Sequence, residues 1–137
     1  MVLKEYKSKK IKSPRDIAEI LQKILSSEDI IDQEKEHFWV IGLKTNNQIK
    51  YIELVSLGSL NETIVYPRET FRLAIMKGVN SIIVAHNHPS NEIEFSRNDI
   101  QITKRLKECG EILGIQLLDH ILITTSSYLS MKQEGLM

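Results

Sequence analysis

The chain has few of the features that identify several large classes of protein. Cys109 is its only cysteine, so no internal disulfide can form, and we expect a reducing, cytoplasmic location. No apolar run approaches the ~20 residues that a membrane-spanning helix needs. The basic N-terminus also lacks the apolar core of a secretory signal. Basic and acidic residues number 18 each, so the net charge gives no overall attraction to nucleic acid or to a membrane.

The length and composition are those of one globular domain. The 137 residues are 42% hydrophobic and 26% charged, which is ordinary for a protein with its own core. Basic residues gather only at the start, where five lysines fall within twelve residues. We therefore expect a flexible basic terminus over residues 1–12 and a single domain over residues 13–137. The alternative role for the lysines is contact with an acidic partner.

Helical and strand patterns are mixed along the chain. Apolar spacing, caps and stops predict helices over residues 14–25, 66–76 and 96–109, with Gly78 and Gly110 ending the last two. Extended runs predict strands over residues 37–43, 49–57, 81–85, 112–118, 121–125 and 128–130, the first two forming a hairpin. An acidic connection is expected up to Glu34, a loop over 58–62 and an extended piece at 64–65. This order predicts an α/β (α+β) domain in which helices flank a mixed sheet.

Two histidines and a carboxylate form the strongest candidate site. His86 and His88 directly follow the buried strand 81–85, and alternation along extended backbone makes both rings point the same way. Asp99 comes eleven residues later, at the start of the predicted helix. Neutral imidazoles and a carboxylate are zinc ligands, and three of them leave the open position that a hydrolytic site needs. A bare His-x-His pair also has a purely structural interpretation.

Three further groups accompany this motif. Ser96 and Asp99 have the spacing of a helix capping box, and the same spacing directs both side chains into one pocket. Glu36 is in phase with Phe38 on the first strand. It is either an exposed acid or a general base. Asp119 and His120 interrupt an apolar stretch, as a polar pair at a strand bend or as groups that orient a metal ligand.

The motif resembles a known family pattern. Residues 85–90 (Ala-His-Asn-His-Pro-Ser) and 96–99 (Ser-Arg-Asn-Asp) resemble the JAMM motif of MPN/JAB-domain metalloproteases. Residues 66–69, 103–106 and 118–120 are similar to signatures of the bacterial RadC branch. The resemblance implies a cytidine-deaminase-like MPN fold and one zinc ion per chain, held by His86, His88 and Asp99. It implies Glu36 as general base and Ser96 as the group that stabilises the tetrahedral intermediate.

The chain departs from the RadC pattern in two places. Asn91 stands where glycine usually follows His-Pro-Ser, and Phe95 stands where proline usually precedes the motif serine. Neither position is a ligand, but both border the expected substrate groove. The resemblance does not include the helix-hairpin-helix region that many RadC proteins carry, so we expect no DNA binding by this domain alone.

The leading hypothesis is a zinc metallohydrolase that cleaves a peptide or isopeptide bond in a peptide or protein substrate. The alternatives are a non-catalytic scaffold that keeps its zinc for stability and a DNA-repair-associated module. A nucleic-acid deaminase is a more remote alternative, because the Pro-Cys-x-x-Cys ligands of that class are missing. No feature of the sequence indicates an oligomeric state.

Overall fold

A six-stranded sheet with helices on both faces forms the body of the computed structural model, which describes residues 2–3, 6–58 and 65–137. The strand order is β1-β3-β2-β4-β5-β6, in which β4 and β5 run parallel and the other neighbours pair antiparallel. The strands are β1 (Val2–Leu3), β2 (Glu36–Leu43), β3 (Ile49–Gly58), β4 (Ser81–Asn87), β5 (Gln116–Ile123) and β6 (Tyr128–Ser130). The helices are α1 (Pro14–Ser26), α2 (Ile30–Gln33), α3 (Pro67–Lys77) and α4 (Arg97–Leu113). The predicted mixed α/β class is confirmed.

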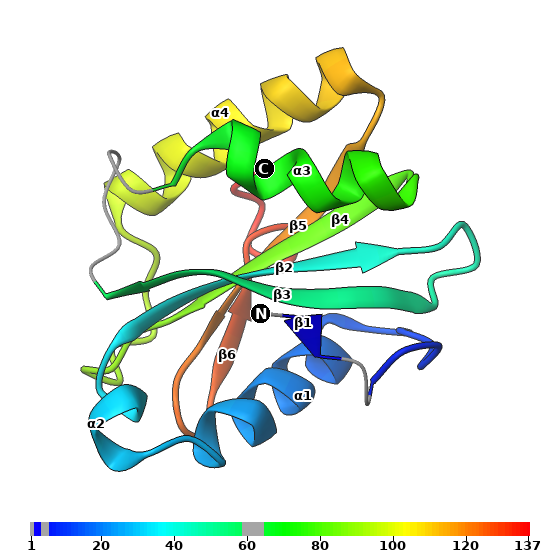
Figure 1. Ribbon diagram of the computed structural model, residues 1–137. Coiled ribbons are helices and arrows are strands. Elements are labelled where there is room, and N and C mark those ends of the chain that lie inside the picture. Colours follow the sequence, from blue (N-terminus) through cyan, green and yellow to red (C-terminus); the bar gives the residue numbers. More distant parts are fainter. Residues whose placement is uncertain (1, 4–5, 59–64) are drawn as a thin grey trace.

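Two apolar cores lie on opposite faces of the sheet. Figure 1 shows α3 and α4 over one face and α1 over the other. Side chains alternate along β2, so Phe38 and Val40 belong to the core beneath α3 and α4, while Trp39 and Ile41 belong to the core beneath α1. Burial on both faces explains why this interior strand is apolar from Phe38 onward. No described helix has the length and apolar character needed to cross a membrane.

The start of α1 follows the predicted cap. The carboxylate of Asp16 accepts hydrogen bonds from the backbone N–H groups of Lys12 and Ser13, at 2.8 and 3.2 Å. The residues just before α1 contact the rest of the domain. Residues 8–11 exchange backbone hydrogen bonds with residues 47–49, and Ile11 is buried in the α1 core. The flexibility of residues 1–12 and the domain limits at residues 12 and 13 stay predictions.

Two sequence predictions in the C-terminal half are wrong. The helix predicted to stop at Gly110 continues to Leu113, and Gly114, at φ 73°, ends it. Gly110 is needed for packing instead, since a Cβ there would lie 2.3 Å from the carbonyl oxygen of Ile115. The two strand segments predicted around Asp119 are one continuous strand, β5.

Other parts of the prediction differ in detail. The expected acidic connection contains the short helix α2. The expected loop begins later, because Gly58 still belongs to β3. The rest of that loop and the first residue of the extended piece at 64–65 lie outside the described residues. The edge strand 128–130, the β2–β3 hairpin and the stop of α3 at Gly78 are confirmed.

Candidate metal centre

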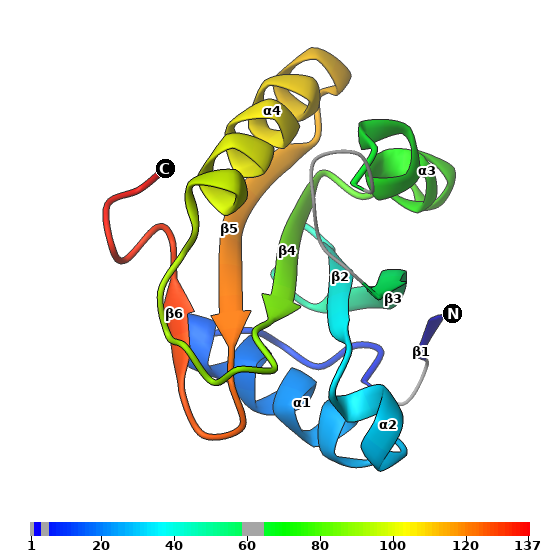
Figure 2. The ribbon, with the colours of Figure 1, turned by 90° about the vertical axis from the view of Figure 1, so that its left-hand side faces the viewer.

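Three predicted ligands meet where β4 ends and α4 begins. Figure 2 shows β4 between β2 and β5, with the loop from β4 leading to α4. His86 lies in β4, His88 follows it, and Asp99 is in the first turn of α4. Their ligand atoms all lie within 4.8 Å of one another. We call His86, His88 and Asp99 the ligand cluster.

The spacing in the ligand cluster is that of a tetrahedral metal site. The two Nε2 atoms are 3.1 Å apart. Asp99 Oδ2 lies 3.4 Å from His86 Nε2 and 3.5 Å from His88 Nε2. Ligands at 2.0–2.1 Å from a tetrahedral zinc are separated by about 3.4 Å. His86 and Asp99 are also buried, at 0% and 4% exposure, so water competes poorly for them.

Hydrogen bonds behind the rings direct their lone pairs into the cluster. His88 Nδ1 faces the carbonyl oxygen of Glu92 at 2.9 Å. A carbonyl only accepts, so this nitrogen carries the hydrogen, and in the neutral ring Nε2 carries the lone pair. The Nε2 atom of His88 is therefore available as a ligand.

A buried relay gives His86 the same orientation. The Thr103 hydroxyl donates to the carbonyl of Asp99 at 2.7 Å, so its oxygen accepts from His120 Nδ1 at 2.5 Å. His120 Nε2 then accepts from His86 Nδ1 at 2.7 Å. Burial lowers the pKa of His120 well below its ordinary value, which keeps this ring neutral. His86 Nε2 is left with its lone pair toward Asp99 and His88.

The electrostatics of the ligand cluster favour a positive charge. Burial by itself would raise the pKa of Asp99, but the adjacent His86 and His88 rings, which donate to this carboxylate when they are protonated, hold that pKa well below its ordinary value. The Asp99 carboxylate in turn raises the pKa of His88, against the opposing effect of burial. Two imidazole lone pairs and a carboxylate thus converge on one point. A proton or a metal ion relieves their repulsion, and the donor set fits zinc.

Ser96 and Asp99 form the predicted capping box, and the Asp99 carboxylate also faces the two histidines. Ser96 caps α4: its side chain accepts from Asp99 N–H at 3.0 Å, and its own N–H donates to Asp99 Oδ2 at 2.8 Å. The capping box therefore also fixes the carboxylate that faces the two histidines. A hydroxyl that accepts through its oxygen can still donate its hydrogen, and Ser96 is exposed at the rim of the cluster.

Glu36 begins β2 on the side of the sheet that carries the ligand cluster. Phe38 pairs with His86 across β2 and β4, and alternation along β2 puts the Glu36 side chain on the same face of the sheet as Phe38 and His86. The negative charge of Glu36 is one of the smaller causes that raise the pKa of His88. The structure therefore brings His86, His88 and Asp99 together, with Ser96 bonded to Asp99 and the charge of Glu36 acting on His88. The catalytic roles of Glu36 and Ser96 stay predictions.

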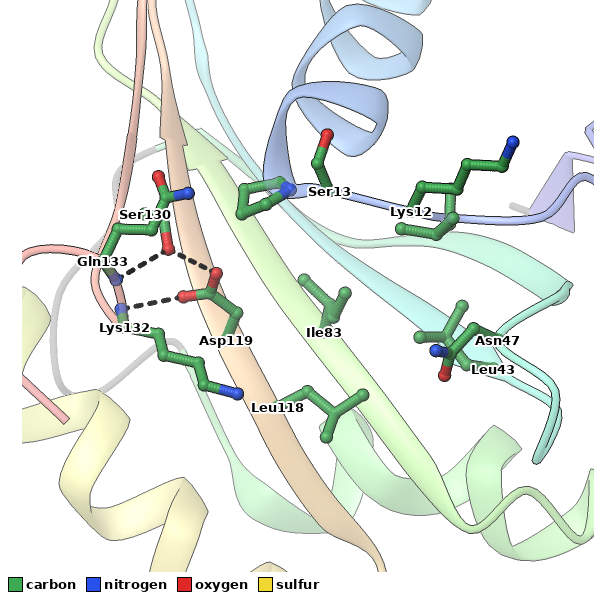
Figure 3. Close-up of a pocket in the computed structure, with 12 residues that line it drawn as sticks. Lys12, Ser13, Leu43, Asn47, Ile83, Leu118, Asp119, Ser130, Lys132 and Gln133 are labelled. Carbon is green, nitrogen blue, oxygen red and sulfur yellow. Dashed lines mark hydrogen bonds between the residues drawn. The ribbon is translucent and has the colours of Figure 1, made fainter.

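The side chains of Asp119 and His120 lie on opposite faces of the sheet, although the backbone N–H of His120 donates to the Asp119 carboxylate at 2.8 Å. Only His120 contacts the ligand cluster; Asp119 faces the α1 side, where it lines a cavity of about 450 Å³ (Figure 3). Its carboxylate accepts from the Ser130 hydroxyl at 2.5 Å and from the Lys132 N–H at 3.0 Å. Asp119 thus anchors β6 and the turn after it, and of the two interpretations left open these contacts fit the structural one.

Thr103 is a site residue that sequence reasoning did not assign. It is 1% exposed and closes the relay behind His86. A signal was present: Thr103 follows Asp99 by four residues, so both lie on one face of α4. No local signal predicts its contact with His120, which comes from another strand.

Comparison with known proteins agrees with this geometry. Residues 11–136 match the model of the RadC-like JAB domain. The chain is 46% identical over 134 residues to a UPF0758 protein of Clostridium acetobutylicum, covering 98% of this chain and 56% of that protein. It is 43% identical over 136 residues to a UPF0758 protein of Bacillus cereus, covering 98% and 58%. A UPF0758 protein of Geobacillus kaustophilus is 46% identical over 125 residues, covering 91% and 53%.

The chain therefore spans about half the length of the curated relatives that it matches. The family match covers β2 to β6 and the ligand cluster, and the mixed sheet flanked by helices is consistent with a JAB/MPN fold. This chain belongs to the RadC-like JAB domain family.

Proposed function

We propose that this domain is a zinc-dependent hydrolase of the JAMM type that cleaves a peptide or isopeptide bond. One zinc ion per chain would be held by His86, His88 and Asp99. The observation that carries the proposal is the convergence of three buried or half-buried ligand atoms at tetrahedral spacing. The proposed partner is a peptide or protein substrate, and the proposed compartment is the cytoplasm.

Each residue has a role that follows from its position. When bound, zinc supplies Lewis acidity that polarises the scissile carbonyl and makes water a better nucleophile. Glu36, on the face of the sheet that carries the ligand cluster, accepts the proton of the attacking water and passes it to the leaving amine. The exposed Ser96 hydroxyl donates to the oxygen on which negative charge develops. His120 holds His86 in the tautomer that leaves its Nε2 free.

The test separates metal binding from turnover. Zinc content is measured by mass spectrometry, and hydrolysis is measured on a library of peptide and isopeptide substrates, with and without a chelator. Asp99→Ala should lose zinc. Glu36→Gln should keep zinc and lose about 10²- to 10⁴-fold in rate, the size of a general-base contribution. Ser96→Ala should also keep zinc and turn over more slowly.

Two results contradict the proposal. A zinc content of one per chain in both His86→Ala and Asp99→Ala proteins would remove the ligand assignment. A zinc-loaded wild-type chain that hydrolyses nothing in the library would favour the scaffold role over the enzyme.

A further inference from the structure

Asn87 lies between the two histidine ligands in the sequence, but its side chain lies on the opposite side of β4. It is 1% exposed, and its amide makes two hydrogen bonds to the backbone of the chain that enters β2. Asn87 Oδ1 accepts from the N–H of His37 at 2.5 Å, and Asn87 Nδ2 donates to the carbonyl oxygen of Lys35 at 3.0 Å. Lys35 and His37 are the immediate neighbours of Glu36.

The Asn87 amide replaces a strand partner. The ladder between β2 and β4 ends at the pair Phe38–His86. Beyond this pair the side-chain amide of Asn87 supplies one acceptor and one donor, as a backbone peptide would. The backbone is thereby fixed on both sides of Glu36. Because His37 faces α1, alternation places the Glu36 side chain on the face of His86 and His88.

The His37 ring strengthens the same attachment. Its Nδ1 donates to the Lys35 carbonyl at 2.8 Å, so this carbonyl receives two hydrogen bonds. Its Nε2 lies 2.6 Å from Glu28 Oε2, and the ring stacks on Trp39 at 5.0 Å between centroids. The His37 ring is fully buried, and its two ring hydrogen bonds are partly buried. The backbone around Glu36 is thus held from the α1 side of the sheet.

We propose that Asn87 is a positioning residue that fixes Glu36 over the metal centre. The inference rests on the base role proposed above for Glu36. Asn87 would then connect the strand that carries the histidine ligands to the segment that carries the base. The loop that carries His88 and the segment that carries Glu36 then move together.

The test follows the position of Glu36 with and without the amide. Asn87→Ala removes both hydrogen bonds. Asn87→Asp is the isosteric variant: it keeps an acceptor for His37 N–H and replaces the donor to Lys35 with an oxygen that repels the Lys35 carbonyl. Asn80→Ala is the matched control, since Asn80 is exposed just before the same strand. The probe is Co²⁺ alone, whose paramagnetism shifts the NMR signals of nearby nuclei according to their distance and direction from the ion.

Asn87→Ala should change only the surroundings of His37 and Glu36. Amide exchange at His37 should quicken about tenfold, as expected for a lost buried hydrogen bond. The cobalt-induced shift at the Glu36 amide should change, while the ring signals of His86 and His88 and the Co²⁺ stoichiometry stay as in wild type. On a substrate from the library, kcat should fall with KM unchanged. Asn87→Asp should restore the His37 protection, and Asn80→Ala should match wild type throughout.

An unchanged Glu36 shift and wild-type kcat in Asn87→Ala, together with loss of turnover in Glu36→Gln, overturn this inference alone. If Glu36→Gln keeps full turnover, the base assignment fails. The exchange and cobalt measurements then still decide whether Asn87 fixes residue 36. Should Asn87→Ala not fold, the same measurements on Asn87→Asp decide: an unmoved Glu36 signal with no change in exchange at either neighbour overturns the inference.

Discussion

Replacing His120 with phenylalanine should weaken zinc binding while leaving the fold intact. The His120 ring packs edge-on against Phe38 and Phe95, at 6.2 and 5.6 Å between centroids. Phenylalanine keeps a ring of similar size in these contacts and removes both nitrogens. The Thr103 hydroxyl still donates to the Asp99 carbonyl, so the main change is the loss of the acceptor for His86 Nδ1–H.

The size of the effect follows from that lost acceptor. A buried donor left without a partner costs about 1–3 kcal/mol. His86 can avoid this cost by moving its hydrogen to Nε2, but that tautomer has no lone pair for the metal. Loss of a group that orients a histidine ligand typically lowers metal affinity about 10- to 100-fold. We therefore expect zinc affinity in His120→Phe to fall within that range.

The assay is competition for Zn²⁺ between the protein and a chromophoric chelator at neutral pH. Asp119→Asn is the matched control, because Asp119 is the adjacent residue and bonds to β6 on the other face. It should lower the free energy of unfolding and leave zinc affinity at the wild-type value. A His120→Phe protein that binds zinc within about threefold of wild type, with Asp99→Ala devoid of zinc, would refute the relay.

Two further predictions concern stability. In zinc-free protein, the lowered pKa of Asp99 contributes stability that is present above the ordinary carboxyl value of 3.8 and lost as pH falls below it. The raised pKa of His88 contributes stability that is present below the ordinary 6.5 and lost as pH rises through its higher folded value. The thermal unfolding temperature, measured in the presence of a chelator, should therefore be highest between these two pH values. An Asp99→Asn protein whose unfolding temperature depends on pH in the same way would contradict this account. Gly110→Ala should lower the free energy of unfolding in urea by about 1–3 kcal/mol, because the new methyl meets the Ile115 carbonyl. Glu111→Ala, at the next and exposed position, should change the free energy of unfolding little. Equal values for the two variants would show that the backbone shifts to accommodate the new methyl group without cost.

Much of the fold was predictable because its signals are local. The apolar run 37–43 indicated an interior strand, and Ser13, Pro14 and Asp16 indicated the start of α1. Gly110 misled because a glycine near a helix end usually stops the helix, whereas here it permits a close backbone contact. That contact joins α4 to the segment before β5, and sequence spacing does not reveal it.

The ligand cluster was predictable for the same reason. His86 and His88 share a side because extended backbone alternates, and Asp99 sits at a helix start marked by Ser96. The orienting groups came from pairings between distant segments. Thr103 meets His120 across seventeen residues, and Asn87 meets Lys35 across fifty-two.

The sequence by itself determined which groups can hold a metal and the elements that carry them, because strand alternation and helix capping act over a few residues. The tertiary structure decided which neighbours support those groups. β5 carries a bulge at Leu118, where Leu117 pairs with Ile82 and Asp119 with Ile83. Strict alternation from Leu117 would turn Asp119 toward the metal and His120 away, and the extra residue exchanges their faces. That register is set by pairing with β4, so only the assembled sheet determines that the histidine, and not the aspartate, stands behind His86.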